Sequence, residues 1–365
     1  MSVHTLISRV LTASLDALPA SIERIDARGL SSDDFSRMYV QASQPCVLLH
    51  AVDEWPACRE WQDSAGFFGD GPAGDEIVSL AVTPDGCADA SDDHTADGAL
   101  RLPCQQRLTL RAAVATLLSP TSCGVAYLSS QNNSLRQEVP SLAAATRGGH
   151  GVLRFGRALG AIEAENIWAS GSHTATSHWH RDHYDNLHTV ITGRKTFWLL
   201  PPSGVLALRK RRVAVQRWVH DTSRCRLNPG IDDVPPGGRS ECWRLGPAPD
   251  ALPPGETSVP WIATAPRAAE EWGDEAVMRP LRVELSAGET LFLPNRWYHE
   301  VVSHSSAAWL TIAVNTWFEA PALGAAANSS SFFEELALQS HDELTARDRP
   351  KECEGRRTAR HRPVG

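Results

Sequence analysis

The chain has 365 residues, of which 42% are hydrophobic, and its formal net charge is -8. This length and apolar content suffice for a large core of one or two domains. The negative balance argues against a nucleic-acid groove as the main surface, and no membrane-length apolar run occurs. Eight scattered cysteines without a Cys-x-x-Cys pair exclude an obvious zinc finger. With no signal segment, they indicate a reduced compartment, the cytoplasm and also the nucleus.

The first 165 residues divide into two parts. Residues 1–45 are expected to be an N-terminal helical region, with Pro19 between two helices and Ser31-Ser32-Asp33-Asp34 as a helix cap. Residues 46–165 mix short strands and helices around an acidic loop that begins at Asp89. Neither part carries an evident catalytic motif by itself.

A polar strand near residue 180 carries metal-ligand chemistry. Residues i and i+2 of a strand point to one face, so His180 and Asp182 offer an imidazole and a carboxylate to one ion. His178 lies on the same predicted face, which leaves a His-x-His pair formally possible. The triplet alone decides little, because two rivals occur, His183-Tyr184-Asp185 and His341-Asp342-Glu343.

The next segment predicts a hairpin. An apolar run over 187–191 leads into a turn at Thr192-Gly193-Arg194 and a returning strand over 195–200. Lys195 shares its face with Phe197 and Leu199, and an apolar face belongs to the interior. Because lysine is rarely buried without a partner, an inward Lys195 beside a metal suggests an anionic ligand such as a dicarboxylate. The alternative is a lysine that extends to the rim.

Residues 203–258 form an insertion that is rich in proline and glycine. It contains the basic run Arg209-Lys210-Arg211-Arg212. We expect this insertion to overhang the site or to decorate the surface.

The second arm of the site lies downstream. A turn at Gly288, a short apolar strand and a break at Pro294 bring His299 to the head of another strand, and 310–315 predict the strand after it. Two imidazoles and one carboxylate are the facial ligand set of non-haem Fe(II) oxygenases, with positions left open for a 2-oxo acid and O₂. Zinc held by the same ligands is the competing interpretation.

The C-terminal residues predict one helix and a tail. Ser331-Phe332-Phe333-Glu334 is a candidate capping box within a helical segment at 320–344. Its apolar residues favour a homodimer through this helix, or docking on the chain's own barrel. Residues 345–365 are basic and are expected to be disordered.

These motifs together resemble one family. The frame of His180-x-Asp182, Lys195 and Gly288-x5-Pro294-x4-His299 resembles the Jumonji-C (JmjC) family of Fe(II)- and 2-oxoglutarate-dependent oxygenases, within the cupin superfamily. For the rival pair His183 and Asp185, the position that corresponds to Lys195 is occupied by Trp198. The segments 82–90 and 182–186 are similar to a subgroup of small hydroxylases to which peptidase and lysyl hydroxylase activities are both attributed.

The resemblance implies a fold and a domain plan. The expected fold is mainly β with helices (α+β), a cupin-like double-stranded β-helix, or jelly roll, with N- and C-terminal helical decoration. The β-helix would lie mainly in 166–319, inside a catalytic region over 46–319.

The resemblance also implies roles for single residues. His180, Asp182 and His299 match the iron ligands at the catalytic centre, and Lys195 matches the partner of the distal carboxylate of 2-oxoglutarate. Further positions at the cosubstrate are Tyr127, Ser177, Asn186 and Asn315, although Tyr127 and Asn315 could equally be satisfied polar groups inside a barrel. Asp185 is the candidate partner for a substrate ammonium group.

The implied activity is hydroxylation of a protein lysine, which consumes 2-oxoglutarate and O₂ and yields succinate and CO₂. The implied protein partner is a developmentally regulated GTP-binding protein. Four alternatives stay open: a tRNA-modifying JmjC hydroxylase, a protein demethylase, a peptidase and a non-catalytic cupin-like binding module. The basic run at 209–212 favours the first. The peptidase lacks a second zinc-protease histidine after His299, and the binding module would be expected to have lost a ligand.

Overall fold

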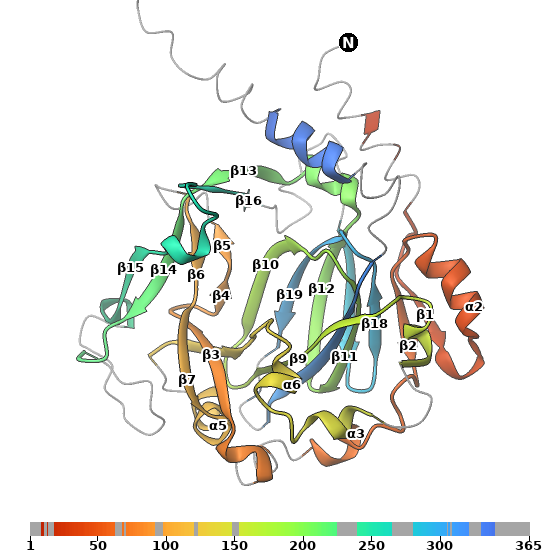
Figure 1. The fold of residues 1–365 in the computed structure, drawn as a ribbon, viewed down its shortest axis with the longest axis horizontal. Coiled ribbons are helices and arrows are strands. Elements are labelled where there is room, and N and C mark those ends of the chain that lie inside the picture. Colours follow the sequence, from red (N-terminus) through yellow and green to blue (C-terminus); the bar gives the residue numbers. More distant parts are fainter. Residues whose placement is uncertain are drawn as a thin grey trace, which may run out of the picture.

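The computed structural model describes residues 9–10, 13, 18–62, 68, 71–91, 98–119, 123–147, 153–224, 239–264, 280–304, 306, 309–320 and 330–339. Two β-sheets dominate these residues (Figure 1). Each sheet is formed from segments that are far apart in the sequence.

The larger sheet contains nine strands in the order β1-β2-β18-β11-β20-β9-β8-β3-β7. All its neighbours run antiparallel except β1 and β2, which are parallel. The strands are β1 (Glu23–Asp26), β2 (Cys46–Leu49), β3 (Ile77–Thr83), β7 (Cys104–Thr109), β8 (Val125–Leu128), β9 (Ile162–Ser170), β11 (Asp185–Thr192), β18 (Thr290–Leu293) and β20 (Thr311–Phe318).

The smaller sheet has the order β17-β12-β19-β10-β4. Its strands are β4 (Cys87–Ala88), β10 (Ala175–Arg181), β12 (Arg194–Leu200), β17 (Leu281–Ser286) and β19 (Tyr298–Ser303). One buried cluster joins both sheets, with Val190 and Leu291 from the larger and Phe197 and Leu285 from the smaller. Burial of these side chains drives the sheets together. The arrangement confirms the predicted mainly β, double-stranded β-helix fold.

The turn at Thr192-Gly193-Arg194 joins the two facing sheets. β11 pairs with β18 and β20, whereas β12 pairs with β17 and β19, so the predicted hairpin is wrong in its pairing. Gly193 has a φ of +75°, and a Cβ there would lie 2.1 Å from Oγ1 of Thr311. Glycine is therefore required where the chain crosses between the sheets.

The predicted helical region 1–45 is only partly helical where it is described. β1 lies inside it and pairs with β2 at the edge of the larger sheet. The predicted cap does form, because Oγ of Ser31 accepts a 3.0 Å hydrogen bond from the backbone N–H of Asp34. The helices there are η1 (Ala27–Gly29), α2 (Ser32–Phe35) and η2 (Ser36–Val40).

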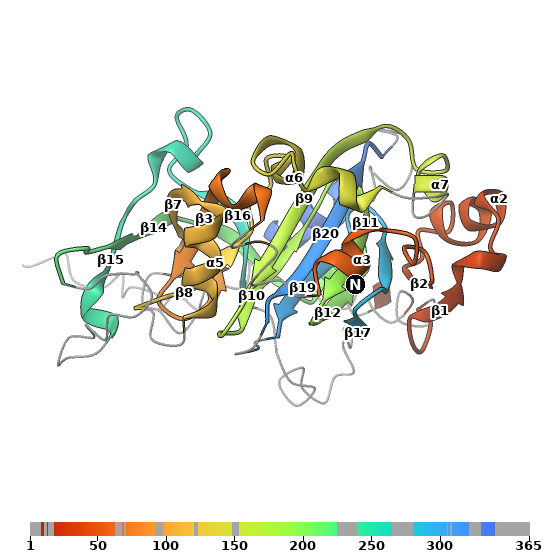
Figure 2. The ribbon, with the colours of Figure 1, turned by 90° about the horizontal axis from the view of Figure 1, so that it is seen from below.

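The helices between residues 57 and 156 are short. They are α3 (Ala57–Glu60), η3 (Pro72–Asp75), α5 (Leu110–Leu118), α6 (Ser134–Gln137), η4 (Ala143–Thr146) and α7 (Leu153–Gly156). Thr109 is the N-cap of α5, and its hydroxyl accepts a hydrogen bond from the N–H of Ala112. The apolar face of α5 contacts β8, β3 and β7. These helices cover the outside of the larger sheet (Figure 2).

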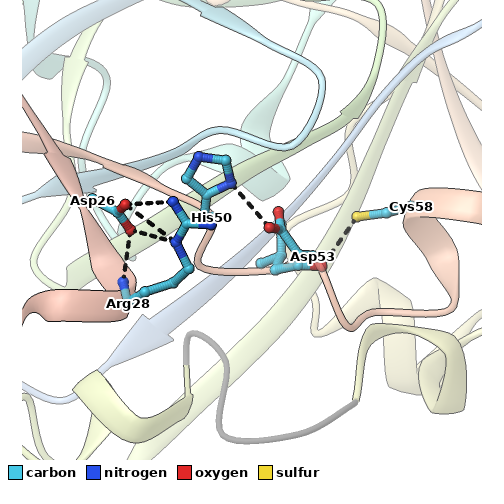
Figure 3. A network of polar contacts seen from close by, with 6 residues as sticks. Asp26, Arg28, His50, Asp53 and Cys58 are labelled. Carbon is cyan, nitrogen blue, oxygen red and sulfur yellow. Dashed lines mark hydrogen bonds and ion pairs between the residues drawn. The ribbon is translucent and has the colours of Figure 1, made fainter.

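A small polar network fastens the chain near the ends of β1 and β2 (Figure 3). Nδ1 of His50 lies 2.9 Å from Oδ2 of Asp53, and Sγ of Cys58 donates to the carbonyl of Val52 at 3.4 Å. The Arg28 guanidinium beside Asp26 lowers the pKa of that carboxyl to about 2. All these contacts are local in sequence, so they stabilise turns rather than a reaction site.

The insertion 203–258 folds into small sheets, together with neighbouring segments. β13 (Arg209–Val213) pairs with β16 (Val259–Thr264), and β14 (Val215–His220) pairs with β15 (Trp243–Pro247) and β6 (Leu100–Leu102). β6 also pairs with β5 (Ala90–Ser91), and the short helices are η5 (Pro202–Leu206), η6 (Arg239–Cys242) and η7 (Pro249–Ala251). β14 and β15 lie at the opposite end of the molecule from α2 in both views (Figures 1 and 2).

A C-terminal helix spans 330–339 and docks on the chain's own barrel. Glu334 forms ion pairs with Arg181 of β10 and with Lys210 of β13, and it accepts a 2.7 Å hydrogen bond from Tyr298 of β19. Phe332 is 59% exposed, so self-association through this helix stays a prediction. The rest of the predicted helical segment after residue 339 and the predicted tail 345–365 lie outside the described residues.

Within the described ranges, no helix has both the length and the apolar character needed to cross a membrane. Cys46, Cys58, Cys87, Cys104 and Cys242 are free thiols. Cys123 is disulfide-bonded, which the scattered cysteine pattern did not predict.

Candidate metal centre and cosubstrate cavity

His180, Asp182 and His299 converge at the centre of the smaller sheet. β10 and β19 are antiparallel neighbours whose register pairs His180 with His299, so the ring centroids lie 4.2 Å apart. Asp182 follows β10 directly, and Arg296 donates its backbone N–H to the Asp182 carbonyl at 2.8 Å. One ligand atom from each of the three side chains lies within 4.8 Å of the others. The structure thus brings together all three predicted metal ligands.

Both imidazoles are oriented by backbone carbonyls. Nδ1 of His180 lies 2.6 Å from the carbonyl of His178, and Nδ1 of His299 lies 3.1 Å from the carbonyl of Trp297. A histidine that donates from one nitrogen presents the other as a lone pair, so each Nε2 is free to face an ion. Burial, with the neighbouring charge of His180, lowers the pKa of His299 to about 4 and keeps it in the neutral, metal-binding form.

The rival ligands point elsewhere. Nδ1 of His178 lies 3.3 Å from Oε2 of Glu300, and His178 is not part of the group formed by the three ligands. His183 lies against the Arg181 guanidinium. The triplet that begins at His341 lies outside the described residues.

Asp185, the predicted partner of a substrate ammonium group, is held by a neighbouring asparagine. Its Oδ1 accepts hydrogen bonds from the backbone N–H and the side-chain amide of Asn295, at 2.8 and 2.9 Å. The side chain is buried, which raises the pKa of the carboxyl, and it does not line the cavity at the metal ligands. Asp185 therefore holds the loop before His299 and is not among the side chains that line the cavity.

Lys195 is fully buried and points into the same cavity, as the strand pattern predicted. Its Nζ donates to the hydroxyl of Tyr127 at 2.9 Å and lies 5.4 and 5.6 Å from the ring centres of Tyr127 and Trp168. Among the residues that the structure describes, no carboxylate pairs with this ammonium. A buried cation whose described neighbours are a hydroxyl and two aromatic rings favours the binding of an anionic ligand.

An amide network closes the opposite wall. Nδ2 of Asn315 donates to Oδ1 of Asn186 at 3.2 Å, and Nε1 of Trp168 donates to Oδ1 of Asn315 at 2.8 Å. Asn186 and Asn315 are on neighbouring strands β11 and β20. Ser177 on β10 also lines the cavity, beside a register shift between Ser177 and His180. All four additional cosubstrate positions predicted from the sequence thus face one cavity.

Sequence reasoning missed several members of this cavity. The additional lining side chains are Gln131, Trp168, His188, Phe197, Val301 and Trp317. His188 is the most unusual, because its Nε2 is buried without a hydrogen-bond partner among the residues that the structure describes. Burial and the charge of Lys195 hold the pKa of His188 well below its ordinary value. The histidine lies inside the apolar run 187–191, and such a position is hard to distinguish from core.

The residues present fit a divalent metal and a dicarboxylate. Two imidazoles and a carboxylate on one face suit Fe(II) and leave the other side of the ion open. Lys195 and Tyr127 line the same cavity and offer it a cation and a hydroxyl, and Oγ of Ser303 lies 3.4 Å from the Tyr127 oxygen. The cavity could therefore hold one end of a small dianion at Lys195 and the other at the metal.

Comparison with known proteins agrees with this chemistry. A family model described as a cupin-like domain matches residues 32–323. A lysine-specific demethylase of Arabidopsis thaliana, JMJ32, is 32% identical over 83% of this chain and 83% of its own length. The bifunctional peptidase and (3S)-lysyl hydroxylase JMJD7 of Homo sapiens is 30% identical over 78% of the chain and 80% of its own length. JmjC domain-containing protein E of Dictyostelium discoideum is 28% identical over 82% of the chain and 84% of its own length.

Proposed function

We propose that this chain, which belongs to the cupin-like JmjC family of 2-oxoglutarate-dependent oxygenases, is an Fe(II)-dependent protein hydroxylase that acts on lysine side chains. His180, Asp182 and His299 would hold the iron, and Lys195 with Tyr127 would bind the distal carboxylate of 2-oxoglutarate. Bound together, iron and 2-oxoglutarate supply the oxidising power to insert one oxygen atom from O₂ into a C–H bond.

The observation that carries this proposal is the buried Lys195 beside the His-Asp-His group. A metal site alone would also suit a zinc hydrolase. A cation buried in the same cavity, without a carboxylate partner among the described residues, adds a requirement for a dianionic cosubstrate. Zinc hydrolysis has no use for such a cosubstrate.

In the reaction, the protein orients the metal ligands and excludes water from the cavity. The carbonyls at 178 and 297 fix the two imidazoles, and the Asn186–Asn315 pair and the Trp168 ring give the cavity rigid walls. The aromatic lining limits the water that reaches the reacting atoms, which favours reaction with the target C–H bond over loss to solvent.

Lysine is chosen as the target because two relatives are named for it, one as a lysine-specific demethylase and one as a lysyl hydroxylase. We favour hydroxylation on carbon, with a GTP-binding protein as the candidate partner. Demethylation of a lysine is the second candidate, since it needs the same metal and cosubstrate and is supported by the more similar of these two relatives.

The test is to map by mass spectrometry which residues of candidate substrates gain oxygen. The purified protein is loaded with Fe(II) without oxygen and then given O₂, 2-oxoglutarate and a cell extract, with His180→Ala as the control. We expect stable single-oxygen additions on lysine, found by mass spectrometry only with the active protein. Formaldehyde release without a retained oxygen would favour demethylation instead. Oxygen on tRNA, or on asparagine or arginine, would contradict the lysyl assignment and leave only an oxygenase.

A further inference from the structure

A second hollow adjoins the metal cavity. Gln131, Trp168 and Ser177 line both, so these three residues lie between the metal cavity and the outer hollow. The outer hollow is bounded by β4, β6 and β14, which places part of the insertion and the 82–90 segment at its rim. A substrate side chain that approached the metal ligands from this side would contact the outer hollow first.

Asp89 is the one carboxylate among the described residues that line this outer hollow. The two arginines there already have acidic partners. Arg217 makes two contacts to Asp250, at 2.8 and 3.0 Å, and Arg107 lies 3.8 Å from Glu138. Asp89, by contrast, forms no side-chain ion pair or hydrogen bond with any residue in the described ranges.

The backbone holds Asp89 in a fixed place beside the metal strand. It follows β4 directly, and β4 runs parallel to β10 with Ala88 paired to Ser177. Its φ is +57°, in the left-handed region that aspartate tolerates better than most residues. The indole N–H of Trp261 donates to the Asp89 carbonyl at 3.1 Å.

Burial of the Asp89 carboxylate in its charged form costs free energy. Burial raises the pKa of Asp89, and the neighbouring His180 and His178 oppose that shift. A half-buried carboxylate without a bonded partner is stabilised by an arriving cation. The hollow therefore suits a cationic side chain better than a neutral or acidic one.

We propose that Asp89 receives the ammonium group of the substrate lysine and so holds the carbon chain of that lysine beside the metal. This inference rests on the proposed function, and it moves the substrate-binding role from Asp185, whose carboxylate is held by Asn295, to Asp89. The aliphatic part of the lysine would lie against Trp168, which is shared by the two hollows.

Asp89→Asn tests the charge alone, because asparagine keeps the shape and also tolerates the left-handed backbone. Asp85→Asn is the matched control. Asp85 is exposed in the same segment, and its contact, Oδ1 accepting from the N–H of Cys87 at 3.0 Å, can be kept by an amide oxygen. The probes are Nα-acetyl-lysine methylamide and its norleucine analogue, which has an apolar side chain of similar length. Binding is measured from the NMR line broadening of each probe by the full-length protein loaded with Mn(II) and 2-oxoglutarate.

We expect the wild type and Asp85→Asn to bind the lysine probe in preference to norleucine. Asp89→Asn should bind the lysine probe about tenfold more weakly or worse, with norleucine unchanged. Equal binding of both probes by the wild type, or equal lysine binding by the wild type and Asp89→Asn, would overturn the role of Asp89. Titrations of Mn(II) and 2-oxoglutarate are read separately. If the wild type failed to bind these two, the proposed function itself would fail.

Discussion

At the residue scale, the metal ligands make the most direct prediction. Because His180 and Asp182 each contribute a ligand atom to the three-residue group, we expect His180→Ala or Asp182→Ala to lower Mn(II) affinity at least about a hundredfold. His183→Ala should leave the affinity within about twofold, since this ring lies against Arg181 instead. Isothermal titration calorimetry measures all three. Equal losses in the three variants would contradict the assignment of ligands.

Lys195 makes a second prediction at this scale. Removing one partner of a buried charge pair typically costs about 3 to 5 kcal/mol, so Lys195→Ala should weaken 2-oxoglutarate binding by about two orders of magnitude or more. Metal affinity should stay close to that of the wild type. Lys210→Ala is the control, because Lys210 is a second buried lysine whose partner is Glu334 rather than a guest. If both variants bound 2-oxoglutarate as the wild type does, Lys195 would have no role at the cosubstrate.

Single residues also mark the limit of what the sequence could predict. His180, Asp182, Lys195 and His299 are linked by spacings that strands and turns translate directly into geometry. The partner of Asp185 could not be predicted in this way, because Asn295 lies 110 residues further along the chain. Asp89 was seen only as part of an acidic loop, since nothing in its sequence neighbourhood reveals that β4 runs beside β10.

At the scale of elements, the docking of the C-terminal helix depends on pH. The guanidinium of Arg181, the hydroxyl of Tyr298 and the charge of Lys210 together lower the pKa of Glu334 from 4.5 to about 2, against the opposing effect of burial. A carboxyl whose pKa is lower in the folded state stabilises that state above its unfolded pKa. This contribution is lost as the pH falls from about 4.5 toward 2.

We therefore expect the protection of the backbone amides over 330–339, measured against the intrinsic exchange rate at each pH, to fall on acidification through this range, before the barrel strands lose protection. Glu334→Gln removes the titrating group. In that variant the helix should exchange faster already at neutral pH and show no further acid step of its own. An unchanged acid step in Glu334→Gln would assign the effect to other groups.

The elements also explain one wrong prediction. β11 and β12 are apolar strands joined by a tight turn, a pattern typical of a hairpin, yet they belong to facing sheets. Their true partners, β18, β20, β17 and β19, come about a hundred residues later, so pairing was decided by long-range burial. The existence and limits of the strands were predictable, but their neighbours were not.

At the scale of the whole molecule, the insertion is part of the folded body. β14 pairs with β6, which precedes it by more than one hundred residues, and β13 supplies Lys210 to the Glu334 cluster. The basic run at 209–212 is thus partly used inside the protein, with Arg212 also paired to Glu256. This weakens the case for an RNA-facing surface there, because these charges already have acidic partners.

The position of Arg181 and Tyr298 has a consequence for the molecule as a whole. Arg181 lies between the ligands His180 and Asp182 in sequence, and Tyr298 directly precedes the ligand His299. Through its contacts with Arg181 and Tyr298, Glu334 therefore binds both strands that carry metal ligands. If the docked helix strengthens metal binding, thermodynamic reciprocity requires that bound metal stabilises the docking of the helix by the same free energy. We expect Mn(II) to slow hydrogen exchange over 330–339 and Glu334→Gln to weaken Mn(II) binding about fivefold. The hydrogen exchange of the C-terminal helix would then show whether metal is bound by His180, Asp182 and His299.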